Sequence, residues 1–197
     1  MWRWRPASGG LALGLLLALL ISRPWLEAGM AWHMGVQIPL LVVVGALLAG
    51  HWRARLSPPG IRRYRATLLL FALFTLALWM LPRLLDAALH QLPVELAKWF
   101  SLPLAGAALR LAWPHLPVIL RGVLHLEAIA TLLRLGWLYL QAPERYCVSY
   151  GIGDQQSLGY LLVIYGALYG GLLAIKILFL PGGVRPLHVE SSNAKLS

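Results

Sequence analysis

The chain has 197 residues, of which 59% are hydrophobic and only 12% are charged. A soluble domain of this length cannot bury so much apolar surface, whereas a bilayer accepts it, so the composition excludes an ordinary soluble domain and predicts a membrane protein. The formal net charge of +10 does not indicate nucleic-acid binding, because five arginines crowd one short loop between apolar runs, as in cytoplasmic loops of membrane proteins. These arginines are Arg53, Arg55, Arg62, Arg63 and Arg65.

Six apolar runs predict an all-α bundle of six transmembrane helices. In chain order they cover Leu11–Ile21, Met30–Gly50, Ala66 to about Leu85, about Val94 to Trp113, about Val118 to Leu140 and about Gln156 to Leu180. Most approach the ~20 residues that a helix needs to cross a bilayer. We therefore expect one transmembrane domain over residues 1–180 and a polar tail over residues 181–197.

The first apolar run has two interpretations. It is short enough to be the core of a cleaved signal peptide. Arg23 and Pro24 follow it in place of a small-x-small cleavage site, which favours a retained helix.

The distribution of Arg and Lys predicts the orientation. The Arg53–Arg65 loop and the Arg110–Arg121 turn are separated by two helices, so both can lie in the cytoplasm. The loops Asp86–Pro93 and Ala142–Gln155 have fewer positive charges and are expected outside. Both termini are then cytoplasmic, and the protein is a multi-pass protein of a bacterial cytoplasmic (inner) membrane.

The last run contains a GxxxG pattern at Gly166 and Gly170, with Gly159 and Gly171 nearby. Small residues let membrane helices approach closely. Packing within the chain is the interpretation we favour, and a homo-oligomer is the alternative.

One helical face of the second run suits a soft metal ion. Met30, His33, Met34 and Gln37 follow the spacing i, i+3, i+4, i+7, and Met80 falls at the same predicted membrane face. Thioether and imidazole groups are typical ligands of Cu(I). The alternative is that the methionines pack in the core and that His33 bonds to a neighbour.

Two further polar groups lie at or within the predicted membrane. Asp154 is expected to cap the sixth helix, and Gln155 and Gln156 would then reach neighbouring helices or a partner. The other group consists of His125, Glu127, Thr131 and Arg134. Ionisable groups at membrane depth should face the protein interior, either as a structural ion pair or as a proton or ion path.

The sequence matches none of the common enzymatic or haem-binding motifs that we considered. A bis-histidine haem needs two histidines at similar depth, whereas His33 lies near the outer end of its predicted helix and His125 near the inner end of its own. The chain has no Walker motif, nucleophile elbow or His-Glu-x-x-His. One cysteine, Cys147, excludes an intrachain disulfide. We expect that the protein is not an enzyme.

Three stretches resemble the CtaG-like integral-membrane assembly factors of cytochrome c oxidase, of the kind associated with caa(3)-type oxidases. Met30–Gln37 is similar to that family's His-Met-x-x-His helix. Trp79–Pro82 with Asp86–Leu89 is similar to its Trp-His-Leu-Pro…Asp-Ala-Ala-Leu segment, and Asp154–Gly159 to its Asp-Gln-Gln-x-x-Gly helix start. In order and spacing, the resemblance covers most of the chain.

The resemblance implies a role in maturation of a terminal oxidase, through copper supply at the outer membrane face, with oxidase subunits as partners. The implied metal ligands are His33, Met34, Met30 and Met80, and the supporting residues are Gln37, Asp86, Asp154, Gln155 and Gln156. Family histidines are replaced by Gln37 and Met80, and a further pair is absent around Val94 to Lys98. A small-solute or ion transporter and a structural subunit of a respiratory complex remain as alternatives.

Overall fold

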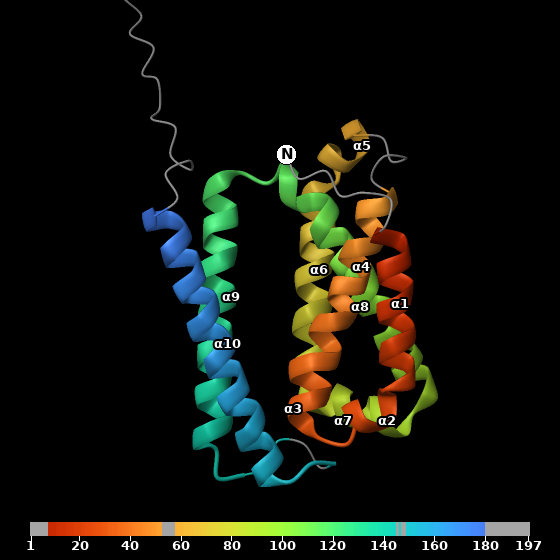
Figure 1. The fold of residues 1–197 in the computed structure, drawn as a ribbon, viewed down its shortest axis with the longest axis vertical. Coiled ribbons are helices and arrows are strands. Elements are labelled where there is room, and N and C mark those ends of the chain that lie inside the picture. Colours follow the sequence, from red (N-terminus) through yellow and green to blue (C-terminus); the bar gives the residue numbers. More distant parts are fainter. Residues whose placement is uncertain (1–7, 53–57, 145, 147–148, 180–197) are drawn as a thin grey trace, which may run out of the picture.

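The computed structural model describes residues 8–52, 58–144, 146 and 149–179, and every regular element in these ranges is helical (Figure 1). The helices are α1 (Ser8–Ile21), α2 (Arg23–Leu26), α3 (Met30–Trp32), α4 (Ile38–Trp52), α5 (Pro58–Arg63), α6 (Arg65–Trp79), α7 (Pro82–His90), α8 (Leu92–Ala112), α9 (Val118–Gln141) and α10 (Ile152–Phe179). A π turn, η1 (His33–Gln37), joins α3 to α4, and a 3-10 turn, η2 (Trp113–His115), follows α8. The predicted all-α class is confirmed for the described residues.

Two helical stretches are long and apolar enough to cross a membrane. They are Met30–Gly50 and Ile152–Phe179. The pair Arg65–Trp79 and Pro82–His90 would be a third if taken as one span. Membrane-spanning character is therefore supported for two or three of the six predicted spans.

The prediction of one continuous third helix is wrong near its C-terminal end. Instead of continuing to about Leu85, α6 ends at Trp79, and α7 begins at Pro82 with a bend of 75°. The proline ring disfavours helical geometry at the residue before it, and Leu81 is accordingly extended (φ −76°, ψ 120°). This break turns α7 across one end of the bundle (Figure 1).

The last helix starts earlier than predicted, at Ile152 rather than about Gln156. Asp154 therefore lies in the first turn and not at the N-cap. Its Oδ2 accepts a hydrogen bond from the backbone N–H of Gly151 (3.4 Å), which is the backward half of a capping box. Gln156 is exposed.

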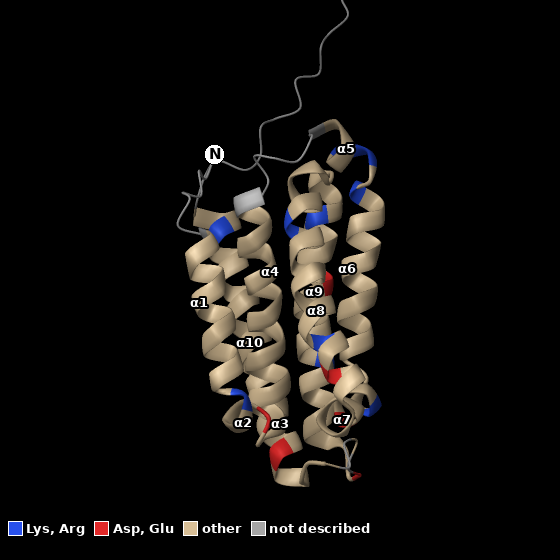
Figure 2. Ribbon diagram, turned by 90° about the vertical axis from the view of Figure 1, so that its right-hand side faces the viewer, with Lys and Arg blue, Asp and Glu red and all other residues tan. Residues whose placement is uncertain are grey.

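Charge is distributed unequally between the two ends of the molecule. We call the end formed by α2, α3 and α7 the α7 end, and the opposite end the α5 end. Lys and Arg are prominent around the α5 end (Figure 2). The described Lys and Arg residues there are Arg62, Arg63, Arg65, Arg110, Arg121 and Lys176.

Helices α1, α4, α6 and α8 form one bundle, with α8 packed against both α4 and α6. The approach of α4 to α8 depends on Gly45 and Gly106. A Cβ atom at Gly45 would overlap the backbone carbonyl of Pro103, and one at Gly106 would overlap that of Val42. No side chain fits between these two backbones.

Helices α9 and α10 form a hairpin beside this bundle, and α10 reaches the bundle through α3 and η1 (Figure 1). Within the hairpin, Gly159 faces Gly136 and Leu140, and Gly166 faces Leu133. Gly159, Gly166 and Gly170 thus pack within the chain, as we favoured, whereas a Cβ atom at Gly171 meets no described atom within 4 Å. The homo-oligomer stays a prediction.

Candidate functional site

A buried lysine lies at the centre of a polar cluster near the α7 end. The side chain of Lys98, in α8, is fully buried. Its Nζ lies 2.8 Å from Glu27 Oε1, 3.1 Å from His33 Nε2 and 3.2 Å from Gln37 Oε1. An ammonium group has three N–H donors, so these three acceptors saturate it. We call Glu27, His33, Gln37 and Lys98 the polar cage.

The hydrogen bonds also determine the tautomer of His33. Tyr150 donates its hydroxyl hydrogen to the backbone carbonyl of Glu27 (2.9 Å), while its oxygen lies 2.9 Å from His33 Nδ1. Nδ1 must therefore carry the proton that it donates to Tyr150, which leaves the Nε2 lone pair to accept from Lys98. A metal ion that bound Nε2 would have to displace the lysine.

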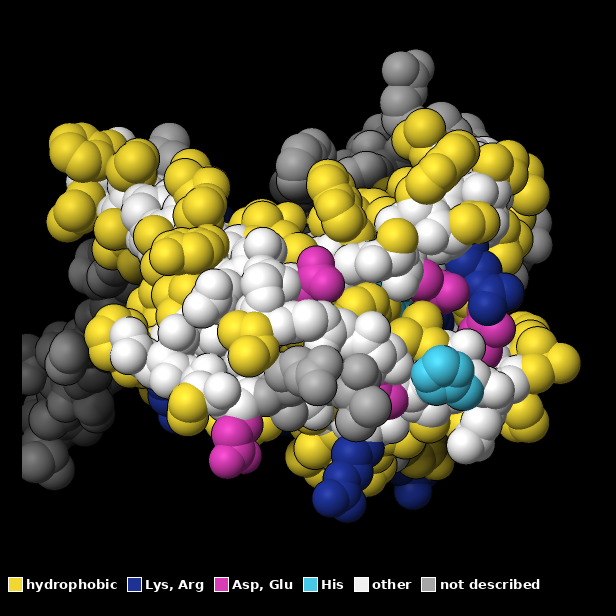
Figure 3. Space-filling model, turned by 90° about the horizontal axis from the view of Figure 1, so that it is seen from below, with side chains coloured by type: hydrophobic (Ala, Val, Ile, Leu, Met, Phe, Trp, Pro, Cys, Tyr) yellow, Lys and Arg dark blue, Asp and Glu magenta, His cyan; other side chains and the backbone are white. Residues whose placement is uncertain are grey.

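A second pair of charges completes the cluster. Arg23 contacts Glu27 Oε2 through Nε (2.9 Å) and Glu95 Oε2 through Nη2 (2.8 Å). Two cations, Arg23 and Lys98, thus face two carboxylates, and their mutual attraction and hydrogen bonds offset part of the cost of removing the buried charges from water. On the surface of this end, acidic and basic side chains lie beside one another (Figure 3).

Local sequence explains how the cage forms. Glu95 and Lys98 are three residues apart in α8, so they share a face. His33 and Gln37 are the first and last residues of the π turn, and both are fully buried. Such turns are rare and occur often at functional sites, because they redirect side chains within a helix.

The carboxylate of Glu27, in the loop between α2 and α3, has its pKa shifted by the charges around it. Burial acts to raise its pKa, but hydrogen bonds and charges from Lys98 and then Arg23 outweigh burial, so the pKa lies below its usual range. The hydrogen bond from Arg23 to Glu27 in turn raises the pKa of that guanidinium.

This shift predicts a pH-dependent stability. Because the folded-state pKa of Glu27 is lowered, its ion pairs stabilise the protein above the ordinary glutamate pKa of about 4.3, and the contribution disappears as the pH falls through the lower folded-state value. We expect the Tm difference between the parent and Glu27→Gln in detergent to be constant near neutral pH and to shrink on acidification below about pH 4. A difference that grows on acidification contradicts this assignment.

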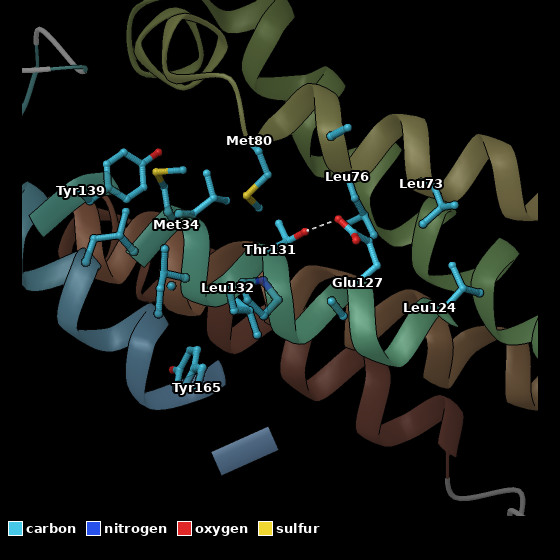
Figure 4. A pocket seen from close by; sticks show the side chains of 17 residues that line it. Met34, Leu73, Leu76, Met80, Leu124, Glu127, Thr131, Leu132, Tyr139 and Tyr165 are labelled. Carbon is cyan, nitrogen blue, oxygen red and sulfur yellow. Dashed lines mark hydrogen bonds between the residues drawn. The ribbon is translucent and has the colours of Figure 1, made fainter. Parts of the chain in front are cut away.

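The predicted copper ligands do not all line one cavity, although Met30, Met34 and Met80 belong to or pack against the same buried core. Met34 and Met80 line a cavity of about 410 Å³, and their side chains are drawn there in Figure 4. His33 is not among the residues that line this cavity, and Met30 is buried in the core. Within the described ranges, no group of three or more His, Cys, Asp or Glu side chains is arranged to hold a metal ion. The ligand set stays a prediction.

Two of the five predicted supporting residues, Asp86 and Gln155, brace the connection from α9 to α10. Gln155 is buried, its Oε1 accepts from the backbone N–H of Tyr146 (3.0 Å), and its Nε2 donates to the carbonyl of Glu144 (3.3 Å). Asp86, in α7, accepts from the backbone N–H of Ser149 (3.3 Å). These bonds hold the connecting segment against the α7 end. Cys147 lies outside the described residues.

The polar group of α9 agrees only in part with the sequence-based expectation. Arg134 Nη2 pairs with both oxygens of Glu127 (2.9 and 3.1 Å), and Thr131 donates to the same carboxylate. The predicted ion pair is thus confirmed. Its predicted position in the protein interior is wrong, because the side chains of Glu127 and Arg134 are 62% and 66% exposed in this chain. His125 bonds instead to Tyr169 of α10.

Sequence reasoning missed the residues that surround His33. Two signals were available: Glu95 and Lys98 place opposite charges three residues apart inside an apolar run, and Arg23 and Glu27 form an i, i+4 pair. Charges within a membrane segment indicate a site by default.

Comparison with protein-family models, with curated proteins and with solved structures finds no match. The functional argument therefore depends on the residues and on the geometry described above.

Proposed function

We propose that this protein is a six-span assembly factor that helps a terminal oxidase to mature at the outer face of a bacterial cytoplasmic membrane. The six spans would be α1, the stretch from α3 to α4, α6, α8, α9 and α10. The basic residues of the α5 end support a cytoplasmic location for that end, which puts the polar cage near the outer face (Figure 2).

The orientation can be tested with single cysteines in a background that lacks Cys147. Gly153 is the second residue of α10, at the α7 end, and Gly60 lies in α5. In intact cells, a membrane-impermeant thiol reagent is expected to label Gly153→Cys and not Gly60→Cys. Labelling of Gly60→Cys alone would invert the topology.

The observation that favours this function is that the three family-like stretches meet near the α7 end. Met34 of the first stretch and Met80 of the second line one cavity together with Leu158 of the third. A Cβ atom at Gly29, just before the first stretch, would lie 3.7 Å from the Asp154 carboxylate. Stretches far apart in sequence thus lie together near the α7 end, as expected if they contribute to one functional site.

The cage favours a scaffold role over stable copper binding. In this arrangement Lys98 occupies the Nε2 lone pair of His33, and the thioethers of Met34 and Met80 face another cavity. These donors do not fit a common copper ion, so we derive no copper step through them. The proposed role is to hold an oxidase subunit while that subunit matures.

We expect Gln155→Ala to lower the amount of assembled oxidase severalfold, because it releases the connection between α9 and α10. The neighbouring exposed residue provides the control, Gln156→Ala, which should leave the oxidase normal. The measurement is oxidase activity, with copper-to-haem ratio, in membranes where this protein is quantified by immunoblot.

The copper-to-haem ratio distinguishes the two forms of the proposal. Under the scaffold role, His33→Ala leaves the ratio of the oxidase that does assemble unchanged. A ratio that falls with His33→Ala would instead support copper delivery. Normal oxidase in a strain that lacks this protein altogether contradicts the proposed function.

The transporter alternative finds less support. A solute path would need polar walls that reach the membrane midplane. The two cavities beside α9 are lined mainly by aliphatic and aromatic side chains, with Glu127 already paired to Arg134.

A further inference from the structure

A long apolar cleft separates the hairpin α9–α10 from α4, α6 and α8. It consists of two adjacent cavities, of about 410 Å³ and about 400 Å³. Both are lined by Leu73 and Leu76 of α6 and by Leu124 and Ala128 of α9. We call the space between these four residues the α6–α9 cleft, and Figure 4 shows the first of its two cavities.

Helix α9 has few neighbours along this cleft. Its buried residues are Gly136 and Tyr139, both in its C-terminal third. Its contacts with α10 extend further, to Leu133, Ile129 and His125, but leave these residues partly or fully exposed. The remaining two thirds of α9 has no buried residue among those described. A transmembrane helix normally gains stability from packing against other helices, so this face is incomplete in the single chain.

The exposed ion pair lies beside the cleft at membrane depth. At about 1.5 Å per residue, Glu127 is about 13 Å from the start of α9 and Arg134 about 10 Å from its end. Both therefore fall within a hydrocarbon layer about 30 Å thick. Glu127 and Thr131 line the cleft opposite Leu76 (Figure 4). Charged groups at this depth are costly unless protein covers them.

We propose that the α6–α9 cleft binds one transmembrane helix of a different membrane protein, and that this helix presents a hydrogen-bond acceptor near its middle. Within the described residues, Arg134 bonds through Nε and Nη2, to Ala130 and Glu127, so its Nη1 group is available as a donor. Asn, Gln, Ser or Thr on the incoming helix would accept from it.

Other occupants fit the cleft less well. A lipid acyl chain offers no polar atom to the ion pair. A second copy of this chain has the same orientation in the membrane. If its α9 entered the cleft, the Glu127 side chains of the two copies would lie at one depth, and the two Arg134 side chains at another. Like charges would then face each other in a medium that screens them poorly.

The identity of the partner rests on the proposed function, under which the helix belongs to an oxidase subunit held during maturation. The cleft and the ion pair themselves do not depend on that assignment, so the two ideas can fail separately.

The test uses a photo-crosslinking amino acid in the full chain in native membranes. Leu73 lines the cleft, and its neighbour Phe74 is 70% exposed and does not. We expect crosslinking at position 73 to an apolar segment of about 20 residues in another protein, mapped by mass spectrometry, and at least severalfold less at position 74. Replacing both Glu127 and Arg134 by Leu should reduce the adduct at position 73 severalfold at equal protein level.

Every other outcome contradicts either the docking proposal or the oxidase as client. Adducts only with lipid, adducts only with this chain, equal yields at both positions, or no effect of the Glu127/Arg134 double replacement would overturn the docking proposal. An adduct with a transmembrane helix of a protein unrelated to the oxidase keeps the docking proposal and contradicts the oxidase as client. Loss of oxidase in a strain without this protein, combined with lipid adducts alone, keeps the function and overturns the docking.

Discussion

Replacing Lys98 with methionine is expected to lower the free energy of unfolding by about 3–5 kcal/mol, which is typical for removal of one partner from a buried ion pair. The change leaves Glu27 Oε1, His33 Nε2 and Gln37 Oε1 without the donor that they share. Methionine is apolar and similar in length to lysine, so it leaves little empty space. The loss of stability therefore measures the missing charge and its hydrogen bonds more than the effect of a new cavity. The measurement is the Tm of detergent-purified protein, together with its amount in the membrane.

Two further variants separate the cage from general effects of lysine removal. Lys176 is exposed on α10, so Lys176→Met should leave the Tm close to that of the parent. Combining Lys98→Met with Glu27→Gln removes the carboxylate that has lost one of its two cationic partners and should recover part of the loss, which a double-mutant cycle measures. If Lys98→Met alone is as stable as the parent, the polar cage does not hold the α7 end together.

The second large effect is expected at the crossing of α4 and α8. Gly45→Ala introduces a methyl group that would overlap the Pro103 carbonyl, and backbone atoms cannot rotate away as a side chain can. The two helices must therefore separate, and overpacking of this kind costs about 1–3 kcal/mol, with the upper end expected here. The Tm in detergent and the yield of folded protein measure the effect.

Gly50 provides a matched control in the same helix. No atom of the described residues lies within 4 Å of a Cβ atom at Gly50, so Gly50→Ala should be neutral or slightly stabilising through its better helix propensity. Equal Tm values for the Gly45 and Gly50 variants would mean that α4 and α8 are further apart than this structure has them.

The sequence by itself determined the all-α class and the approximate limits of the long helices, whereas the short helices α2, α3, α5 and α7 were not predicted. Long apolar runs ended by Pro, Gly and charged residues form helices because a buried or lipid-exposed backbone must satisfy its own hydrogen bonds. The ion pair of Glu127 and Arg134 was also readable, because both residues lie on one face of one helix. The break before Pro82 had a visible signal in the proline, but the sequence does not define the direction in which the chain turns.

Only the tertiary structure decided what surrounds His33. Spacing along one helix put it with the methionines, whereas its actual partners, Lys98 and Tyr150, are 65 and 117 residues away in the chain. Which helices become neighbours depends on where two backbones can approach, as at Gly45 and Gly106, and local periodicity contains no information about that choice. A buried polar side chain must then bond to whatever the neighbouring helix presents, and in this protein that group is an ammonium ion.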